Sequence, residues 1–230
     1  MAEALARDDR RRVVAALGSE REVYDAPPAE ETRGGFAGAE GLMTALKWRR
    51  YDAVIDASPP FDAASSGMAA TACRALGLPL LHLRRPGWTL EETARLRRVR
   101  DAAAAARDVS LFSRIFIDVG RADMLAFRQR RDAWFLARLH APVRGRFPLP
   151  RGDFAIGRPP FPLAHERVLL RDYRINQVVL RDEGGAAGRT TLAAAQALDL
   201  PVIVIDRPPV PSGPLAETVE EALAWLDARL

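Results

Sequence analysis

DAVIDASPPFDAASSGMAATACRALGLPLLHLRRPGW (residues 52–88) is the stretch of sequence that decides the fold. A hydrophobic run over 51–57 is followed by two adjacent prolines, Pro59 and Pro60, and then by a run of small side chains over 64–77. That run ends at Gly77, a residue suited to the left-handed conformation of a helix end. A second hydrophobic run, 78–86, closes at a proline. The stretch therefore predicts a strand, a helix and a second strand, the repeating unit of a parallel sheet.

The same alternation extends over the rest of the chain. Strands are predicted over 11–18, 113–120, 133–140, 176–185 and 201–209, and helices over 39–50, 89–107, 121–131, 189–200 and 215–230, with a helix ending over 167–175. Thr89, with Glu92 three residues later, is a capping-box signature for the helix 89–107. The pattern predicts an α/β protein with two Rossmann-like parallel-sheet domains, residues 1–107 and 113–230. Ligands of such sheets bind at the carboxyl ends of the strands, here expected to face one cleft between the domains.

Composition limits the class of partner. The chain has 230 residues, 48% of them hydrophobic and 28% charged, with a net charge of +4 carried almost wholly by arginine. Arginine favours carboxylate and phosphate ligands, although a GC-rich genome would also enrich arginine and alanine. The basic residues are interleaved with acidic ones and show no alternation with aromatic residues, which speaks against nucleic acid as a partner.

Targeting signals and metal-binding patterns are also missing from the sequence. No apolar run is long enough to span a bilayer, and the first residues lack the apolar core of a signal peptide, so we expect a cytoplasmic protein without membrane contact. A single cysteine, Cys73, excludes an internal disulfide. His82, His140 and His165 do not have the spacing of metal ligands, and we predict no metal site.

Several motifs occur in the order and spacing of a known family. They are RGGFAGAEGL (33–42), DASPPFDAASSGMAATAC (56–73), RRPGW (84–88), IFIDVGRADMLAF (115–127), GRPPF (157–161) and LRDEGGAAGRTTLAAAQALDLPVIVIDRP (180–208). From about residue 13 to its end, the chain resembles the precorrin-6A reductases, including the cobalt-precorrin-6A reductases. The resemblance implies hydride transfer from NADPH, with NADH as the alternative, to a ring double bond of a cobalamin precursor. The substrate it implies is a polycarboxylated tetrapyrrole.

The resemblance also implies which residues form the site. Cofactor-binding residues would be Ser19, Arg21, Gly34, Gly35, Phe36, Asp56, Ala57 and Ser58. Substrate-binding residues would be Pro60, Phe61, Ser66, Arg85, Gly120, Arg121, Arg181, Gly184 and Gly185. No catalytic side chain is assigned, because hydride transfer depends on positioning more than on a reacting side chain.

The chain departs from the family pattern at several of these motifs. Pro59 replaces a histidine, Met68 an asparagine, and Thr191 a lysine of the helix after the diglycine. Asp182 and Glu183 add negative charge where a polyanionic substrate is expected, so either they point away or the pocket receives a different ligand.

The family's opening strand and glycine-rich turn have no counterpart, because the first residues match the latter part of the helix that follows them. Either those elements are encoded upstream of Met1 or the nucleotide site has been lost. Three functions therefore stay open. The chain is a precorrin-6A reductase, a catalytically degenerate protein that binds a tetrapyrrole or a partner, or an oxidoreductase for another carboxylated substrate.

Overall fold

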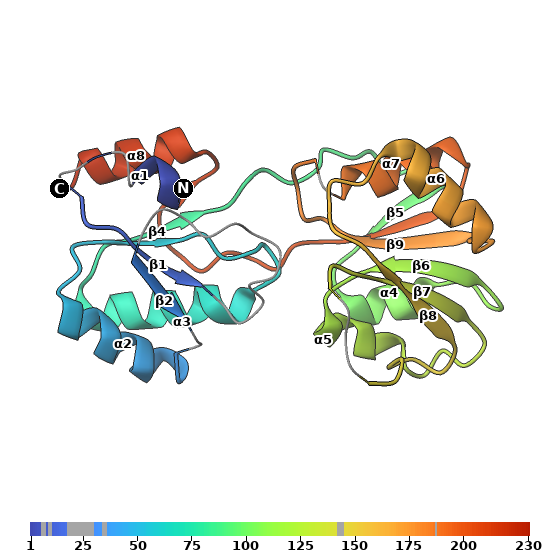
Figure 1. The fold of residues 1–230 in the computed structure, drawn as a ribbon, viewed down its shortest axis with the longest axis horizontal. Helices are drawn as coiled ribbons and strands as arrows, with labels where there is room; N and C mark the ends of the chain where they lie inside the picture. Colours follow the sequence, from blue (N-terminus) through green and yellow to red (C-terminus); the bar gives the residue numbers. More distant parts are fainter. Residues whose placement is uncertain (6–7, 9–10, 18–29, 34–35, 142–144, 187) are drawn as a thin grey trace. The chain divides into compact units, whose positions relative to one another are not determined.

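The chain forms two compact units. The computed structural model describes residues 1–5, 8, 11–17, 30–33, 36–141, 145–186 and 188–230. Unit 1 consists of Met1–Pro86 with Pro208–Leu230, and unit 2 consists of Gly87–Arg207 (Figure 1). This division differs from the boundary near 107–113 expected from the sequence, because residues 96–99 pair with a strand of unit 2 and the closing helix packs in unit 1.

Unit 1 is built on parallel strands. Its elements are α1 Ala2–Leu5, β1 Val14–Leu17, β2 Glu30–Arg33, α2 Gly38–Arg49, β3 Val54–Asp56, α3 Ala63–Leu76, β4 Leu80–Leu83, β11 Leu215–Ala216 and α8 Val219–Asp227. The strands form a three-stranded sheet in the order β11-β4-β3 and a separate β1-β2 pair, all parallel. Helices α2 and α3 cover one face of the three-stranded sheet and α8 covers the other (Figure 1). The strand-helix-strand unit predicted for 52–88 is therefore confirmed.

Unit 2 contains a six-stranded parallel sheet. Its elements are β5 Leu96–Val99, α4 Ala102–Asp108, β6 Arg114–Asp118, α5 Arg121–Met124, the 3₁₀ helix Leu125–Phe127, β7 Trp134–Leu139, β8 Gly152–Ile156, α6 Leu163–Asp172, β9 Gln177–Arg181, α7 Arg189–Ala197 and β10 Val202–Ile205. The strand order is β5-β10-β9-β6-β7-β8. Helices α6 and α7 cover one face, with α4 and α5 on the other (Figure 1). The α/β class with parallel sheets is confirmed.

The helix predicted over 89–107 is wrong. Residues 96–99 form strand β5, because Leu96 and Val99 are buried where β5 pairs with β10. Helix α4 starts later, and its N-cap is Asp101, whose carboxylate accepts a hydrogen bond from the Ala104 N–H at 2.7 Å. Glu92 accepts instead from the backbone of Arg98, across the turn before β5, so the capping-box spacing at 89–92 does not start a helix.

Besides β5, three short strands were not expected from the sequence: β2, β8 and β11. The proline-rich stretch 141–166 contains β8, which pairs with β7 at the edge of the six-stranded sheet. The stretch after β10 contains β11, so 201–209 is not the last strand, and α8 begins after its N-cap Thr218 rather than at 215. Prolines in both stretches hid these strands, because proline is compatible with a sheet mainly at its edges.

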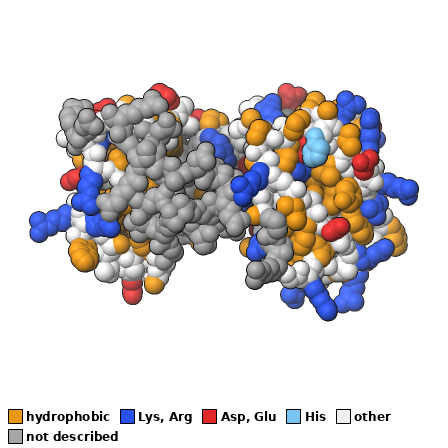
Figure 2. Space-filling model, in the orientation of Figure 1, with side chains coloured by type: hydrophobic (Ala, Val, Ile, Leu, Met, Phe, Trp, Pro, Cys, Tyr) orange, Lys and Arg blue, Asp and Glu red, His pale blue; other side chains and the backbone are white. Residues whose placement is uncertain are grey.

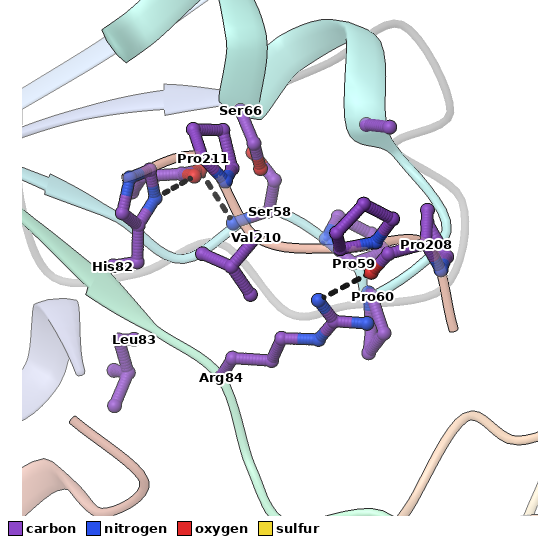
Figure 3. Close-up of a pocket in the computed structure, with 13 residues that line it drawn as sticks. Ser58, Pro59, Pro60, Ser66, His82, Leu83, Arg84, Pro208, Val210 and Pro211 are labelled. Carbon is purple, nitrogen blue, oxygen red and sulfur yellow. Dashed lines mark hydrogen bonds and ion pairs between the residues drawn. The ribbon is translucent and has the colours of Figure 1, made fainter. Parts of the chain in front are cut away.

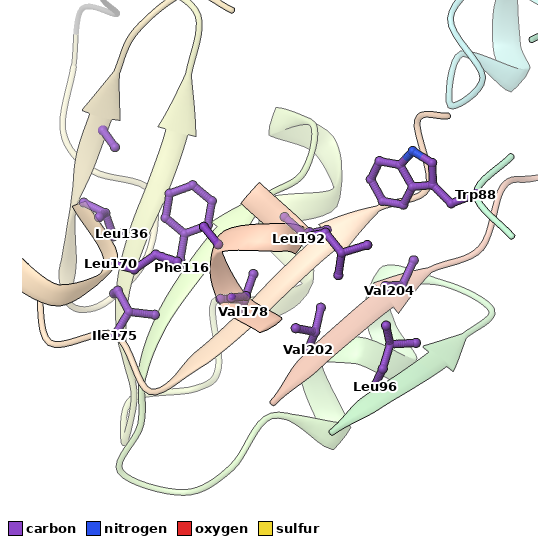
Figure 4. Close-up of a cluster of buried hydrophobic side chains, with 14 residues drawn as sticks. Trp88, Leu96, Phe116, Leu136, Leu170, Ile175, Val178, Leu192, Val202 and Val204 are labelled. Atoms are coloured by element: carbon purple, nitrogen blue, oxygen red, sulfur yellow. The ribbon is translucent and has the colours of Figure 1, made fainter. Parts of the chain in front are cut away.

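The core of unit 2 lies between the sheet and helices α6 and α7 (Figure 4). Phe116 of β6, Leu170 of α6 and Leu192 of α7 are at most 2% exposed. Trp88 joins the same cluster from the segment that enters the unit. Burying such apolar side chains between parallel strands and helices is the main stabilising contribution in a fold of this kind.

We expect Phe116→Ala to lower the free energy of unfolding by about 3–5 kcal/mol, because it leaves a cavity in this cluster. Urea denaturation of the purified protein measures the change. Leu111→Ala, at a position 71% exposed, is the control and should change the free energy by less than about 0.5 kcal/mol. Equal losses in the two variants would contradict this description of the core.

Candidate functional site

The corner after β3 is held by the side chains of two aspartates. Asp56 ends the strand, and its Oδ1 accepts a hydrogen bond from the Ser58 N–H at 3.1 Å. Asp62 is the N-cap of α3, where Oδ1 accepts from the Ser65 N–H at 3.0 Å and Oδ2 from its hydroxyl at 2.7 Å. Pro59 is exposed between them, and its carbonyl accepts from the Asp62 N–H. The paired prolines therefore end the strand and lead directly into the helix.

Asp56 forms a buried pair with His82 of the neighbouring strand β4. The carboxylate Oδ2 lies 2.8 Å from His82 Nδ1, and the histidine is 2% exposed. Burial opposes ionisation of Asp56, but hydrogen bonds from Ser58, Ser66 and His82 outweigh it and lower the pKa of the carboxyl. Because the carboxylate is an acceptor, we assign the Nδ1 proton to His82, and its Nε2 is then the atom available to a ligand.

A small pocket opens over this pair (Figure 3). Its volume is about 20 Å³, which is room for a water-sized group rather than for a whole ligand. Asp56, Ser58, Ser66, His82 and Arg84 are its polar lining, and prolines from the corner and from 208–211 supply most of the remainder. His82 Nε2 is buried and has no hydrogen-bond partner among the described residues. The pocket therefore offers hydroxyls and an orphaned imidazole nitrogen to a polar group.

The structure brings only some of the predicted unit 1 residues to this pocket. Asp56, Ser58, Pro60 and Ser66 line it. The other described candidates do not: Ala57 and Arg85 are exposed, Phe36 packs against the α2–α3 core, and Phe61 is half-buried outside the lining. Ser19, Arg21, Gly34 and Gly35 lie outside the described residues.

The strand order of unit 2 reverses between β6 and β9. From β6 the chain adds β7 and β8 on one side, and β9 and β10 form the other side. Parallel α/β sheets bind ligands at the carboxyl ends of the two strands that flank such a reversal. Gly120 and Arg121 follow β6, whereas Arg181 ends β9 and Gly184 and Gly185 follow it. Five predicted substrate-binding residues therefore lie at one edge of one sheet.

Gly120 makes room for Arg181. A Cβ atom built on Gly120 would lie 2.5 Å from Nη1 of Arg181, so any larger residue would displace the guanidinium. The Arg181 side chain is 21% exposed and forms ion pairs with Asp123 of α5, at 3.6 Å, and with Glu183. Glu183 thus partly neutralises the arginine that precedes it. Arg121 is exposed at the start of α5.

Asp182 does not present its charge to a ligand. It is 2% exposed, and Oδ1 accepts hydrogen bonds from the Trp88 N–H at 3.0 Å and the Gly184 N–H at 3.2 Å. Oδ2 accepts from Arg98 of β5 at 3.0 Å. Arg207 donates to the Asp182 carbonyl at 2.7 Å. The carboxylate of Asp182, which departs from the family pattern, therefore forms its hydrogen bonds within the fold.

The diglycine turn is shaped by its backbone and by Trp88. Gly184 and Gly185 have φ of +66° and +62°, values that other residues adopt with strain. The Trp88 indole N–H donates to the Gly185 carbonyl at 2.9 Å, and a Cβ on Gly188 would lie 2.9 Å from the indole ring. Trp88 is thus a packed residue that holds the turn.

Thr191, which stands in place of a lysine, is also used internally. Its hydroxyl donates to Glu166 Oε2 at 2.6 Å, and Glu166 in turn accepts two hydrogen bonds from Arg138 of β7, at 2.6 and 2.9 Å. All three side chains are buried. The Arg138 guanidinium also lies 3.9 Å from the centre of the Phe161 ring. Thr191 therefore serves as a second donor to the buried carboxylate of Glu166.

Sequence reasoning missed His82, Arg138 and Asp118 as members of these two regions. The sequence links His82 to no site, because its partner Asp56 is 26 positions away. Strand pairing brings two of them into these regions: His82 pairs with Asp56 across β4–β3, and Asp118 pairs with Leu180 across β6–β9. That register is not readable without the strand order.

Comparisons with known proteins agree with one another. The sequence model of the family described as Precorrin-6x reductase CbiJ/CobK matches residues 1–227. The precorrin-6A reductases of Rhodococcus erythropolis and Rhodobacter capsulatus are each 37% identical to the chain, over 204 residues (87% of this chain, 81% of that one) and 202 residues (87% and 80%). A solved structure of CobK precorrin-6A reductase matches with a TM-score of 0.88 and 34% identity, covering 99% of this chain and 91% of the other.

The chain belongs to the precorrin-6x reductase family. The resemblance stated from the sequence motifs is therefore confirmed. Among the described residues, no helix is long and apolar enough to cross a membrane, and no three His, Cys, Asp or Glu side chains converge as metal ligands would. Basic side chains, with acidic ones between them, are scattered over the described part of the face shown in Figure 2.

We expect Asp56→Asn to destabilise the reductase in a pH-dependent way. The lowered pKa of Asp56 means that its stabilisation is fully present above the ordinary value of 3.8 and is lost as the pH falls through the folded-state value. At pH 7 the variant should lose about 1–3 kcal/mol, because the buried Nδ1–H of His82 loses its charged acceptor.

Urea denaturation between pH 3 and pH 8 measures the difference from the wild type, which should be constant at neutral pH and shrink in acid. Asp52→Asn, at an exposed position just before the same strand, is the control and should show no such trend. A difference that does not vary with pH would contradict an ionised Asp56.

Proposed function

We propose that this protein is a precorrin-6A reductase that uses NADPH to reduce a ring double bond of its carboxylate-rich macrocycle. The observation that carries the proposal is the edge of the six-stranded sheet, where Gly120, Arg181 and the diglycine turn lie at the reversal of strand order. Membership of the precorrin-6x reductase family supports this choice of substrate.

The substrate would bind at that edge through Arg181 and the backbone of the diglycine turn. A guanidinium binds carboxylates with two parallel hydrogen bonds, which suits a macrocycle fringed with carboxylates. Arg181 is held by Asp123 and Glu183 yet keeps 21% of its side chain exposed. Because the two acids fix its direction, the guanidinium is oriented before any substrate arrives.

The polar residues of the small unit 1 pocket would contact one polar group of a nucleotide cofactor. The orphaned His82 Nε2 can accept a hydrogen bond from a hydroxyl or an amide, and Ser66 and Ser58 supply further polar groups. The pocket also lies at the carboxyl end of β3, where nucleotides bind in sheets of this type. A bound nicotinamide would supply the hydride. The chain's own task is to orient that group and to exclude water from it.

The alternative of a catalytically degenerate protein has less support. Pro59 shapes the start of α3, Asp182 anchors Trp88 and Arg98, and Thr191 binds Glu166. These three departures from the family pattern thus each have a structural partner within their own unit. A chain that had merely lost selection on its site would not be expected to satisfy every substituted polar group.

Titration with NADPH and with NADH, followed by nicotinamide fluorescence, tests the proposal first. Oxidation of NADPH at 340 nm on addition of precorrin-6A, with mass spectrometry of the product, tests it second. The expected results are tighter binding of NADPH than of NADH and a product heavier by two hydrogens. Binding of the tetrapyrrole without binding of either nucleotide would instead favour a catalytically degenerate protein. Reduction of another carboxylated substrate, and not of precorrin-6A, would favour an oxidoreductase with a different substrate.

We expect Gly120→Ala to raise KM for precorrin-6A about tenfold or more, because the new methyl group displaces the Arg181 guanidinium and a hydrogen bond to a charged group contributes about 1.5–3 kcal/mol. The dissociation constant for NADPH should not change. Gly67→Ala in α3, where an added Cβ meets nothing within 4 Å, is the matched control. Steady-state kinetics measure both variants, and an unchanged KM in Gly120→Ala would remove Arg181 from the substrate site.

A further inference from the structure

Asp118 lies at the centre of the unit 2 edge and has no role in the site as described so far. It is the last residue of β6, and its Cα pairs with that of Leu180, the residue before Arg181 in β9. It therefore stands at the reversal of strand order, two residues before Gly120. The side chain is only partly exposed. Its carboxyl group makes no hydrogen bond or ion pair with any other residue that the structure describes.

Charged groups surround this carboxyl from both neighbouring strands. Arg138 faces it from β7 and His140 from the residue just after β7, whereas Arg181 and Glu183 face it from the end of β9 and the turn that follows. On the helix side, Asp123 of α5 binds Arg181. Two of the cations are committed to other acids, Arg138 to Glu166 and Arg181 to Glu183. Asp118 therefore sits among charges without an ion-pair partner of its own.

The balance of these effects keeps the carboxyl protonated more readily than an ordinary aspartate. Burial raises the pKa of Asp118, and Glu183 raises it further, whereas the positive charges of Arg138, His140 and Arg181 lower it without overcoming the burial. A carboxyl group with a raised pKa keeps its proton to a higher pH and is better suited to deliver it to a reacting group.

Reduction of a ring double bond needs such a proton. We propose that Asp118 is the general acid of the reaction, donating a proton to the macrocycle from the strand-reversal edge of unit 2. This role rests on the proposed function, because it requires a substrate bound at that edge. Asp118 lies within the motif 115–127, but it is not among the site residues that the resemblance implies.

The step is balanced as follows. The hydride forms a C–H bond at one atom of the double bond, and the π-electron pair moves to the neighbouring ring atom. That atom takes the proton from Asp118, whose O–H bond breaks to leave a carboxylate. Solvent then reprotonates Asp118, so each turnover consumes one NADPH and one proton and yields NADP⁺ and the dihydro product.

The test compares wild type with Asp118→Asn and Asp118→Glu, using NADPH and precorrin-6A from pH 6 to pH 9. Asp118→Asn should lower kcat by about 10²–10⁴-fold, leaving KM and the NADPH dissociation constant near their wild-type values. Asp118→Glu should restore part of kcat, since it returns an acid. In the wild type, kcat should fall as the pH rises above the pKa of Asp118, and in Asp118→Asn it should not vary with pH. Asp153→Asn, an exposed aspartate on β8 of the same sheet, is the control for the loss of one charge.

A readout independent of turnover uses ¹³C-labelled aspartate. The carboxyl resonance missing from Asp118→Asn should titrate in the wild-type protein with a pKa above the ordinary value of 3.8. A normal titration, a kcat within threefold of wild type, or a loss confined to KM would each overturn the role as an acid. These outcomes are separable from failure of the proposed function, in which the wild type itself would neither bind NADPH nor reduce precorrin-6A.

Discussion

The buried carboxylate of Asp182 is the interaction on which the substrate edge of unit 2 depends. It accepts hydrogen bonds from three separate parts of the chain: Trp88 at the entry to the unit, Arg98 on strand β5, and Gly184 in the diglycine turn. A buried carboxylate is stable only when several donors replace the water it has lost. These hydrogen bonds hold the diglycine turn and the Trp88 segment in one arrangement. Asp182, whose charge is unexpected from the sequence, therefore orders the turn.

Several arginines of unit 2 likewise form ion pairs and hydrogen bonds within the fold. Arg98 binds Asp182 and Asp206, Arg130 binds Asp132 and three backbone carbonyls, and Arg138 binds Glu166. These guanidinium groups bind carboxylates and backbone carbonyls from separate segments, a role suited to a planar group with five donors. A net charge of +4 therefore says little about the ligand, and the affinity for an anion has to come from a few placed groups such as Arg181.

The sequence allowed the parallel α/β class and most long elements to be predicted, because buried strands and amphipathic helices have distinct periodicities. The helix predicted over 89–107 failed because Leu96 and Val99 have helical spacing as well as strand partners, and only pairing with β10 decides between them. The motif glycines and Arg181 could be assigned to a site from the resemblance. Asp118 and His82 could not, since each acquires its neighbours through strand register across separate segments.

Asp56 and Asp118 show why register matters chemically. Each aspartate ends a parallel strand, one in unit 1 and one in unit 2. Burial opposes ionisation of both, but Asp56 receives hydrogen bonds from Ser58, Ser66 and His82 that lower its pKa, whereas for Asp118 burial prevails and its pKa is raised. The same side chain therefore ionises more readily at one strand end and less readily at the other. Opposite pKa shifts suit two carboxyl groups to different tasks, positioning at one strand end and proton donation at the other.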